Sequence, residues 1–182
     1  MKDLITRIST GDREAFAELV RRFEKKVYSV AYRMLGNHLD ADEVTQETFV
    51  RIYERRSELR SVNYISSFIL RIATNYSIDL IRRRQKKFIA VDDLDYLPDV
   101  QLELAQKIVS PDSFLEDAEI LGIIKEGIAT LPPKQKLAIV LHDIEGYSKT
   151  EIADTLGCPQ ATVRSNLHIA RVKLRKWLEK RM

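Results

Sequence analysis

The chain has little of what builds a disulfide-bonded, zinc-binding or membrane-spanning protein. Its 182 residues include one cysteine, Cys158, which excludes an internal disulfide framework and a cysteine-rich zinc site. No apolar run approaches the ~20 residues of a membrane-spanning helix. The charged start at Lys2 and Asp3 is unlike a signal peptide. We therefore expect a cytoplasmic protein without membrane insertion.

Glycine and proline are also scarce, with six and five residues, and no useful length of sequence alternates apolar and polar residues as a half-buried strand does. Hydrophobic residues make up 45% of the chain and recur at every third and fourth position. That is enough apolar material to bury real cores. The predicted fold class is all-α, with two small helical bundles joined by an acidic linker.

The net charge of +3 is distributed unevenly along the chain. Residues 1–87 carry 18 basic and 12 acidic side chains, residues 88–119 carry one and nine, and residues 120–182 carry 11 and six. Basic modules favour a polyanion through counterion release, whereas an acidic segment does not lie on the same phosphates. We therefore place modules at 1–87 and 113–182. The acidic linker, 88–112, is expected to bind something else or to keep the modules apart.

Two helices are expected early in the first module. Residues 12–35 put their apolar side chains on one helical stripe and stop at Gly36. Asp40 and Glu43 have the spacing of a capping box, so a second helix is expected to open there and to end near Arg55.

Further helices are expected on both sides of the linker. One runs from about residue 63 to 84 and continues into a basic run. Within the linker, residues 100–108 have the pattern of a short helix. The second bundle begins near Ser113, turns at residues 131–133 and leads into residues 147–171.

Residues 147–171 have the pattern of a helix-turn-helix. Ser148 and Glu151 have capping-box spacing, and Gly157 is placed to end the first helix. Apolar positions of the second helix recur at helical spacing, at Val163, Leu167 and Ala170. Its outward positions carry donors and acceptors of the kind that read base edges, namely Arg164, Ser165, Asn166, His168 and Arg171. The alternative is a helical hairpin with a solvated face.

Four polar residues of the second expected helix share one face: Asp42, Glu43, Gln46 and Glu47. They form a candidate docking face for a basic partner, and the alternative is an ordinary solvated surface. A metal site is not expected, because only His38 is close in sequence and no second helix supplies a matching ligand pair.

The helix at 63–84 mixes aromatic, amide and guanidinium groups, which suits unstacked bases and phosphates. At this spacing, however, Phe68 and Tyr76 are more often core residues. Asn75 and the basic tail are harder to explain as packing.

In this order the motifs resemble those of a known family. Residues 42–51 resemble the polymerase-binding helix of sigma region two, residues 68–84 its promoter-melting helix, and residues 131–175 sigma region four. With a short linker in place of a third domain, nearly the whole chain resembles the extracytoplasmic-function (ECF, group four) sigma factors. The resemblance implies an alternative sigma factor that binds core RNA polymerase and directs promoter-specific initiation at −10 and −35 elements.

The resemblance also implies roles for particular residues. By the resemblance, the residues expected to dock on the clamp helices of the largest polymerase subunit are Asp42, Glu43, Gln46, Glu47 and Phe49. The loop 57–63 is expected to hold a flipped base of the single-stranded −10 element. The residues expected to recognise this element are Arg60, Asn63, Phe68, Arg71, Asn75, Arg82 and Arg83. The residues expected to contact the duplex −35 element are Ser148, Lys149, Thr150, Thr162, Arg164, Ser165, Asn166, His168, Arg171 and Lys173. The acidic linker would run toward the RNA exit path and imitate a nucleic acid there.

Three positions depart from the family pattern. Phe68 stands where relatives often have tryptophan, which keeps an aromatic face but removes the indole donor. Asn166 and Ile169 stand where arginine is common, so two potential phosphate or guanine contacts are lost. The resemblance implies core polymerase, promoter DNA and, as in many relatives, an anti-sigma factor as partners. It implies no cofactor and no metal, and a monomer when free.

Other classes of function fit the sequence less well. Catalysis needs a nucleophile with a base, or a metal set, but Cys158 has no matching histidine, and His38, His142 and His168 are scattered. A dimeric helix-turn-helix regulator would leave the acidic and melting-type helices without a role. A purely structural adaptor would leave the two basic modules unexplained.

Overall fold

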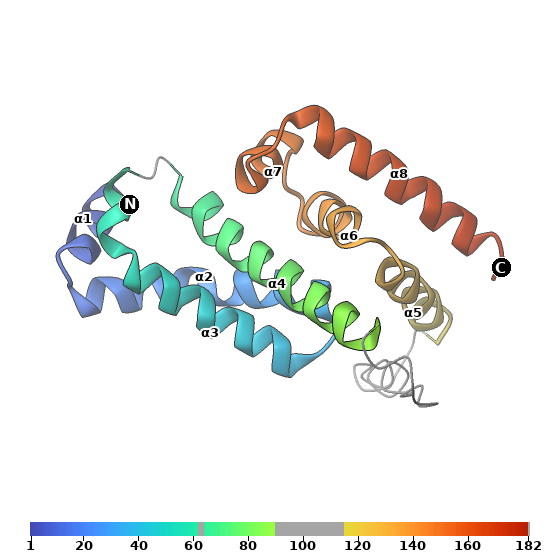
Figure 1. Cartoon of the computed structure of the whole chain (residues 1–182), viewed down its shortest axis with the longest axis horizontal. Coiled ribbons are helices and arrows are strands. Elements are labelled where there is room, and N and C mark those ends of the chain that lie inside the picture. Colours follow the sequence, from blue (N-terminus) through green and yellow to red (C-terminus); the bar gives the residue numbers. More distant parts are fainter. Residues whose placement is uncertain (62–63, 90–114, 182) are drawn as a thin grey trace.

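The computed structural model describes residues 1–61, 64–89 and 115–181, and their regular structure is helical throughout (Figure 1), as predicted. None of the described helices is both long and apolar enough to cross a membrane. The first bundle consists of α1 (Lys2–Ser9), α2 (Arg13–Leu35), α3 (His38–Glu54), the 3₁₀ helix η1 (Arg56–Ser61) and α4 (Ile65–Ile89). The second consists of α5 (Leu115–Ala129), α6 (Pro133–Ile139), the π-helical segment η3 (Val140–Ile144), α7 (Lys149–Leu156) and α8 (Gln160–Leu178).

Local signals set the ends of α2. The Asp12 carboxylate accepts a hydrogen bond from the Ala15 amide at 3.0 Å, and Gly36 ends the helix in the left-handed conformation with φ of 80°. The predicted helix at 12–35 is thus confirmed. Helices α2, α3 and α4 all contact one another and enclose a core of fully buried aliphatic side chains, among them Leu19 and Ile52.

The predicted start of α3 was wrong. The helix begins at His38, and its N-cap is Asn37, whose side-chain oxygen accepts a hydrogen bond from the Asp40 amide at 2.8 Å. Asp40 therefore lies inside the first turn, where its 9% exposed side chain pairs with Arg84 of α4 at 2.5 Å. Two more differences are α1, which no sequence signal had suggested, and η1, which occupies much of the expected loop at 57–63.

The helix-turn-helix forms as predicted. The Ser148 hydroxyl accepts from the Glu151 amide at 3.2 Å, and the Glu151 carboxylate accepts from the Ser148 amide at 2.8 Å, which completes a capping box. Gly157 ends α7 with φ of 61°. The apolar side of α8, Val163, Leu167 and Ala170, is buried.

Helices α5 and α8 approach closely at one glycine. A methyl group added to Gly127 would lie 3.0 Å from Cε3 of Trp177, whereas one added to Gly122, earlier in the same helix, would meet nothing within 4 Å. Gly127 therefore allows α5 to pack closely on α8, and Gly122 lies outside this contact.

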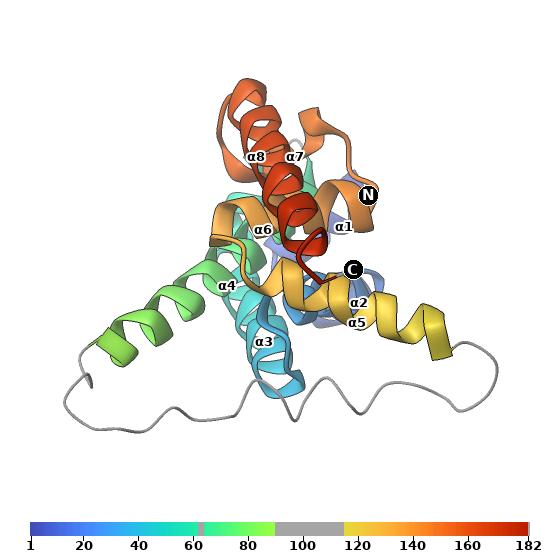
Figure 2. The same cartoon turned by 90° about the vertical axis from the view of Figure 1, so that its right-hand side faces the viewer.

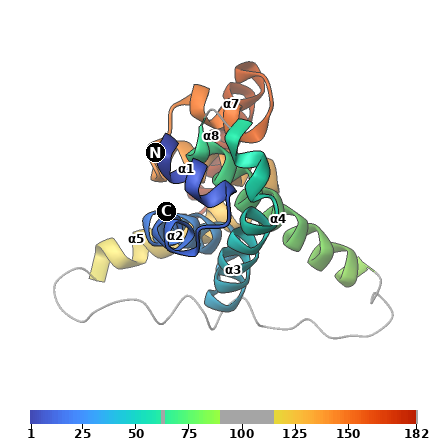
Figure 3. The ribbon, with the colours of Figure 1, turned by 90° about the vertical axis from the view of Figure 1, so that its left-hand side faces the viewer.

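The two bundles also pack on each other. Figures 2 and 3 show α7 and α8 above α2 and α3 from two opposite sides. Buried residues of α2 and α4, including Met34 and Leu70, belong to the same apolar cluster as Leu141, Ile152 and Leu167 of the second bundle. The core is therefore continuous across both modules. The expected helix at 100–108 and almost all of the linker 88–112 lie outside the described residues, so the domain limits stay a prediction.

Candidate functional site

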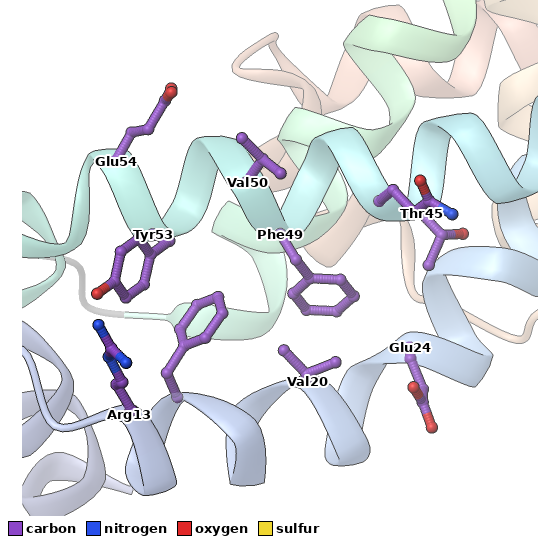
Figure 4. A pocket seen from close by; sticks show the side chains of 10 residues that line it. Arg13, Val20, Glu24, Thr45, Phe49, Val50, Tyr53 and Glu54 are labelled. Atoms are coloured by element: carbon purple, nitrogen blue, oxygen red, sulfur yellow. The ribbon is translucent and has the colours of Figure 1, made fainter.

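A groove of about 930 Å³ runs between α2 and α3 on the surface of the first bundle (Figure 4). The side chains that line it are Arg13, Phe16, Val20, Glu24, Thr45, Gln46, Phe49, Val50, Tyr53 and Glu54. Phe49 lies at its floor and is only 7% exposed, whereas Val50 at its edge is 50% exposed. Phe16 and Tyr53 meet edge to face, with ring centroids 5.0 Å apart. The groove thus offers an apolar strip between polar ends.

The structure divides the four-residue polar face of α3 into two pairs. Gln46 lines the groove, and Asp42, one turn before it, is exposed. Glu43 and Glu47 turn toward α4 instead. The Glu43 carboxylate accepts a hydrogen bond from the Tyr76 hydroxyl at 2.7 Å.

A cation completes this contact between α3 and α4. Arg51 pairs with Glu47 at 2.7 Å, and its guanidinium lies 4.7 Å from the centre of the Tyr76 ring. The hydrogen bond to Glu43, together with burial, raises the pKa of Tyr76. Two of the predicted docking carboxylates therefore also brace the helix that carries the candidate −10 residues.

The candidate −10 residues of α4 differ in their surroundings. Asn75, Arg82 and Arg83 are exposed, with Arg82 3.8 Å from Asp79. Phe68 is half-buried beneath the Arg55 guanidinium, at 5.9 Å from the ring centre.

Two further expectations for this helix have different outcomes. Tyr76 is buried, as the core interpretation predicted. Arg71 points to the second bundle, where its guanidinium donates to the Thr155 carbonyl at 2.8 Å and to the Asp154 carbonyl. The side chain of Arg60 and the whole of Asn63 lie outside the described residues.

Most candidate −35 residues of the helix-turn-helix are exposed. Exposed members of this set are Ser148, Thr150, Thr162, Arg164, Ser165, His168, Arg171 and Lys173, while Lys149 and Asn166 are half-buried. The hydroxyl of Ser148 is engaged in the capping box. The exposure of Ser165 and His168 fits an outward-facing recognition helix.

Gln160, which the sequence did not single out, joins two of these side chains. Its side-chain NH₂ group donates to the Thr150 hydroxyl at 2.8 Å, and its oxygen accepts from Arg164 at 2.6 Å. Its position one turn before Arg164 on α8 was the available signal.

Arg171 is held in a two-point ion pair with Asp143 of η3, with N to O distances of 2.5 and 3.1 Å. The hydrogen bonds that the Arg171 guanidinium donates to this carboxylate raise the pKa of Arg171 above its usual value. In the part of the chain that is described, no group of three or more His, Cys, Asp and Glu side chains is arranged to hold a metal ion.

Comparisons with known proteins agree with this layout. The family model for sigma-70 region 2 matches residues 19–87, and the model for sigma-70, region 4 matches residues 121–174. The ECF RNA polymerase sigma factor SigW of Bacillus subtilis is 34% identical over 182 residues, which cover 98% of this chain and 96% of that protein. SigE of Mycolicibacterium smegmatis, an ECF RNA polymerase sigma factor, is 35% identical over 175 residues, covering 94% of this chain and 66% of that protein.

Solved structures show the same fold at lower sequence identity. CnrH in complex with the cytosolic domain of CnrY superposes with a TM-score of 0.70 at 23% identity, covering 98% of this chain and 97% of that one. The sigma factor RpoE of Bartonella quintana, in complex with the anti-sigma factor NepR, gives 0.67 at 19% identity, with 90% and 96% covered. The chain belongs to the ECF group of the sigma-70 family, the alternative sigma factors that direct promoter recognition by RNA polymerase.

Proposed function

We propose that the α2–α3 groove, together with Asp42, is the surface that docks on the clamp helices of core RNA polymerase. The observation that carries this is the apolar strip with exposed Val50 at its edge and Gln46 in its wall. An amphipathic helix places its apolar side chains in such a groove. The exposed carboxylate of Asp42 would then attract basic side chains beside that apolar face.

Glu43 and Glu47 take a second role in this proposal. Each already has a partner, Tyr76 and Arg51, in the contact between α3 and α4. If polymerase displaced Tyr76 and Arg51 from these carboxylates, the hydrogen bonds that they donate to Glu43 and Glu47 would be lost. We therefore assign polymerase contact first to Asp42, and to Glu43 and Glu47 mainly the positioning of α4.

Promoter contact is divided between the two bundles. We assign the single-stranded −10 element to α4 and the segment before it, with Asn75, Arg82 and Arg83 as the accessible residues of that helix. The duplex −35 element is assigned to α8, whose Arg164 and His168 face solvent. Exposure of both sets on helix faces supports the assignment.

The protein would act as a specificity subunit in the cytoplasm, where its polymerase is, with no catalytic residues of its own. An anti-sigma protein is proposed as a further partner. The sigma factor RpoE of Bartonella quintana, which has this fold, was solved in complex with an anti-sigma factor.

A charge reversal tests the docking surface. Asp42→Arg puts a cation where a basic partner would lie, so affinity for core polymerase should fall at least about tenfold. The matched control is Asp3→Arg, the same change at an exposed site on α1. Affinity is measured by co-migration with core polymerase, and function by run-off transcription from a matched promoter.

Glu43→Gln separates docking from helix positioning. It keeps an acceptor for the Tyr76 hydroxyl and removes one negative charge, so we expect polymerase affinity near that of the wild type. If Asp42→Arg binds polymerase as tightly as Asp3→Arg does, the groove is not the docking surface. If the wild-type protein yields no promoter-dependent transcript above core alone, the promoter assignments are wrong.

A further inference from the structure

Two apolar side chains are exposed on the second helix of the helix-turn-helix. Ile169 and Val172 of α8 are each 39% exposed, and they lie three positions apart, about one helical turn. The buried side of the helix is formed by other residues, Val163, Leu167 and Ala170. Covering exposed isoleucine and valine with another apolar group is favourable, so this pair suits an apolar contact outside the protein's own core.

The apolar pair continues the line of a residue assigned to the −35 element. Ser165, which is exposed, precedes Ile169 by four positions and Val172 by seven, the spacing at which side chains share one side of a helix. At a rise of about 1.5 Å per residue, the line from Ser165 to Val172 is about 11 Å long. The major groove of DNA is ~12 Å wide. Both apolar side chains are therefore within reach of the groove that Ser165 faces.

Cations border the apolar pair. Lys173 follows Ile169 by four positions, Lys176 follows Val172 by four, and both lysines are exposed. Lysine is depleted at interfaces between proteins, whereas DNA places phosphates on both sides of its base edges. The charge around the pair therefore favours DNA over an apolar protein surface as its occupant.

The chemistry of the major groove narrows the occupant further. The 5-methyl group of thymine is the apolar group that bases present there, while guanine, adenine and cytosine present hydrogen-bond donors and acceptors. An isoleucine side chain makes no hydrogen bonds, so covering a donor or acceptor with it removes water without replacing the lost bond. Ile169 should therefore attract thymine and disfavour the other bases at the position that it covers.

We propose that Ile169, with Val172 beside it, recognises thymine in the −35 element by covering its 5-methyl group. The proposal rests on the assignment of that element to α8. The preceding turn carries Arg164, whose guanidinium donates to the Gln160 side-chain oxygen at 2.6 Å. Arginine pairs best with guanine. We therefore expect guanine and thymine at different positions of the element, each facing a different turn of the helix.

Deoxyuridine tests the methyl contact, because it pairs as thymine does and lacks only the 5-methyl group. The holoenzyme first selects its sites from promoter fragments with a randomised −35 element. Each thymine of the selected element, on either strand, is then replaced singly by deoxyuridine, and the affinity of the holoenzyme is measured. Loss of a covered methyl group should weaken binding by the wild type about fourfold at one or two positions.

Substitution of Ile169 should remove this sensitivity. We expect Ile169→Ala to bind the thymine fragment about fourfold more weakly than the wild type, with no further loss when deoxyuridine replaces the contacted thymine. The matched control is Leu121→Ala, which also truncates an exposed aliphatic side chain, 55% exposed, but on α5 outside the helix-turn-helix. It should keep the fourfold effect of deoxyuridine.

A gain of preference complements this loss. Ile169→Arg supplies a guanidinium, so sites selected by this variant should carry guanine where the wild type selects the contacted thymine. Because it gains a specificity, this variant keeps the test informative if Ile169→Ala is less stable.

Three outcomes would count against these assignments. Deoxyuridine without effect at every thymine, or with equal effects on the wild type and Ile169→Ala, would overturn the methyl contact. If Ile169→Ala weakened binding equally for every −35 sequence, Ile169 would contact polymerase and not thymine. A holoenzyme that selects no preferred −35 sequence at all would instead refute the assignment of that element to α8.

Discussion

Arg171 allows a quantitative test of how the second bundle contacts DNA. The resemblance assigned it to the duplex −35 element, whereas the structure pairs it with Asp143 at 2.5 and 3.1 Å. Either Asp143 orients Arg171 for a phosphate, or the pair only braces η3 against α8. Replacing Arg171 by alanine removes the cation in both cases, so affinity at one salt concentration does not separate them.

The salt dependence of DNA binding separates these two roles of Arg171. Each phosphate contact contributes about 0.9 to the slope of log affinity against log salt, so its loss weakens the effect of a fourfold rise in salt by about 3.5-fold. If Arg171 contacts a phosphate, the slope for Arg171→Ala should be smaller by about 0.9. If the pair is only a brace, the slope stays unchanged. The lost ion pair itself is worth less than about 1 kcal/mol, because Arg171 is 52% exposed.

The assay is the binding of holoenzyme to a promoter fragment at several salt concentrations between about 50 and 200 mM. Arg181→Ala is the matched control, because Arg181 forms a similar exposed pair with Glu126 at 2.7 Å near the C-terminus, away from the helix-turn-helix. We expect a smaller slope for Arg171→Ala and the wild-type slope for Arg181→Ala. Equal slopes for the two variants would refute Arg171 as a phosphate contact.

Other predictions concern stability and specificity. Gly122→Ala should stabilise the protein by about 1 kcal/mol, because alanine has the higher helix propensity. Gly127→Ala should not stabilise it, because the added methyl group would crowd Trp177 of α8. The free energies of unfolding of both variants are measured in urea. Burial lowers the pKa of Lys136 to about 8. The unfolded lysine keeps its proton up to about pH 10.5, so stability should rise from pH 8 to 10.5, and Lys136→Met should abolish that rise in melts across this range. Gln160→Ala should lower the ratio of promoter to nonspecific DNA affinity about fivefold by releasing Arg164, and an unchanged ratio would refute this.

The sequence alone determined the features that depend on neighbours a few residues away. The end of α2 at Gly36, the Ser148–Glu151 capping box and the glycine after α7 were predicted correctly. These are contacts within one turn, fixed by residue type and spacing. The order of the three motifs likewise sufficed to identify the family, because spacing along the chain needs no coordinates.

Contacts between helices were decided by the tertiary structure alone. Asp40 looked like a cap but pairs with Arg84 of another helix, and Glu43 looked like part of a free acidic face but accepts a hydrogen bond from Tyr76. The resemblance assigned Arg71 to the −10 element, and in the structure its guanidinium donates to the Thr155 carbonyl of α7.

The two glycines of α5 show the physical reason. Gly122 and Gly127 are in the same helix, and nothing local distinguishes them, yet only Gly127 lies against Trp177 of α8. Periodicity tells which face of a helix is buried. Which atoms meet that face depends on how the two helices cross, and only the tertiary structure sets that crossing.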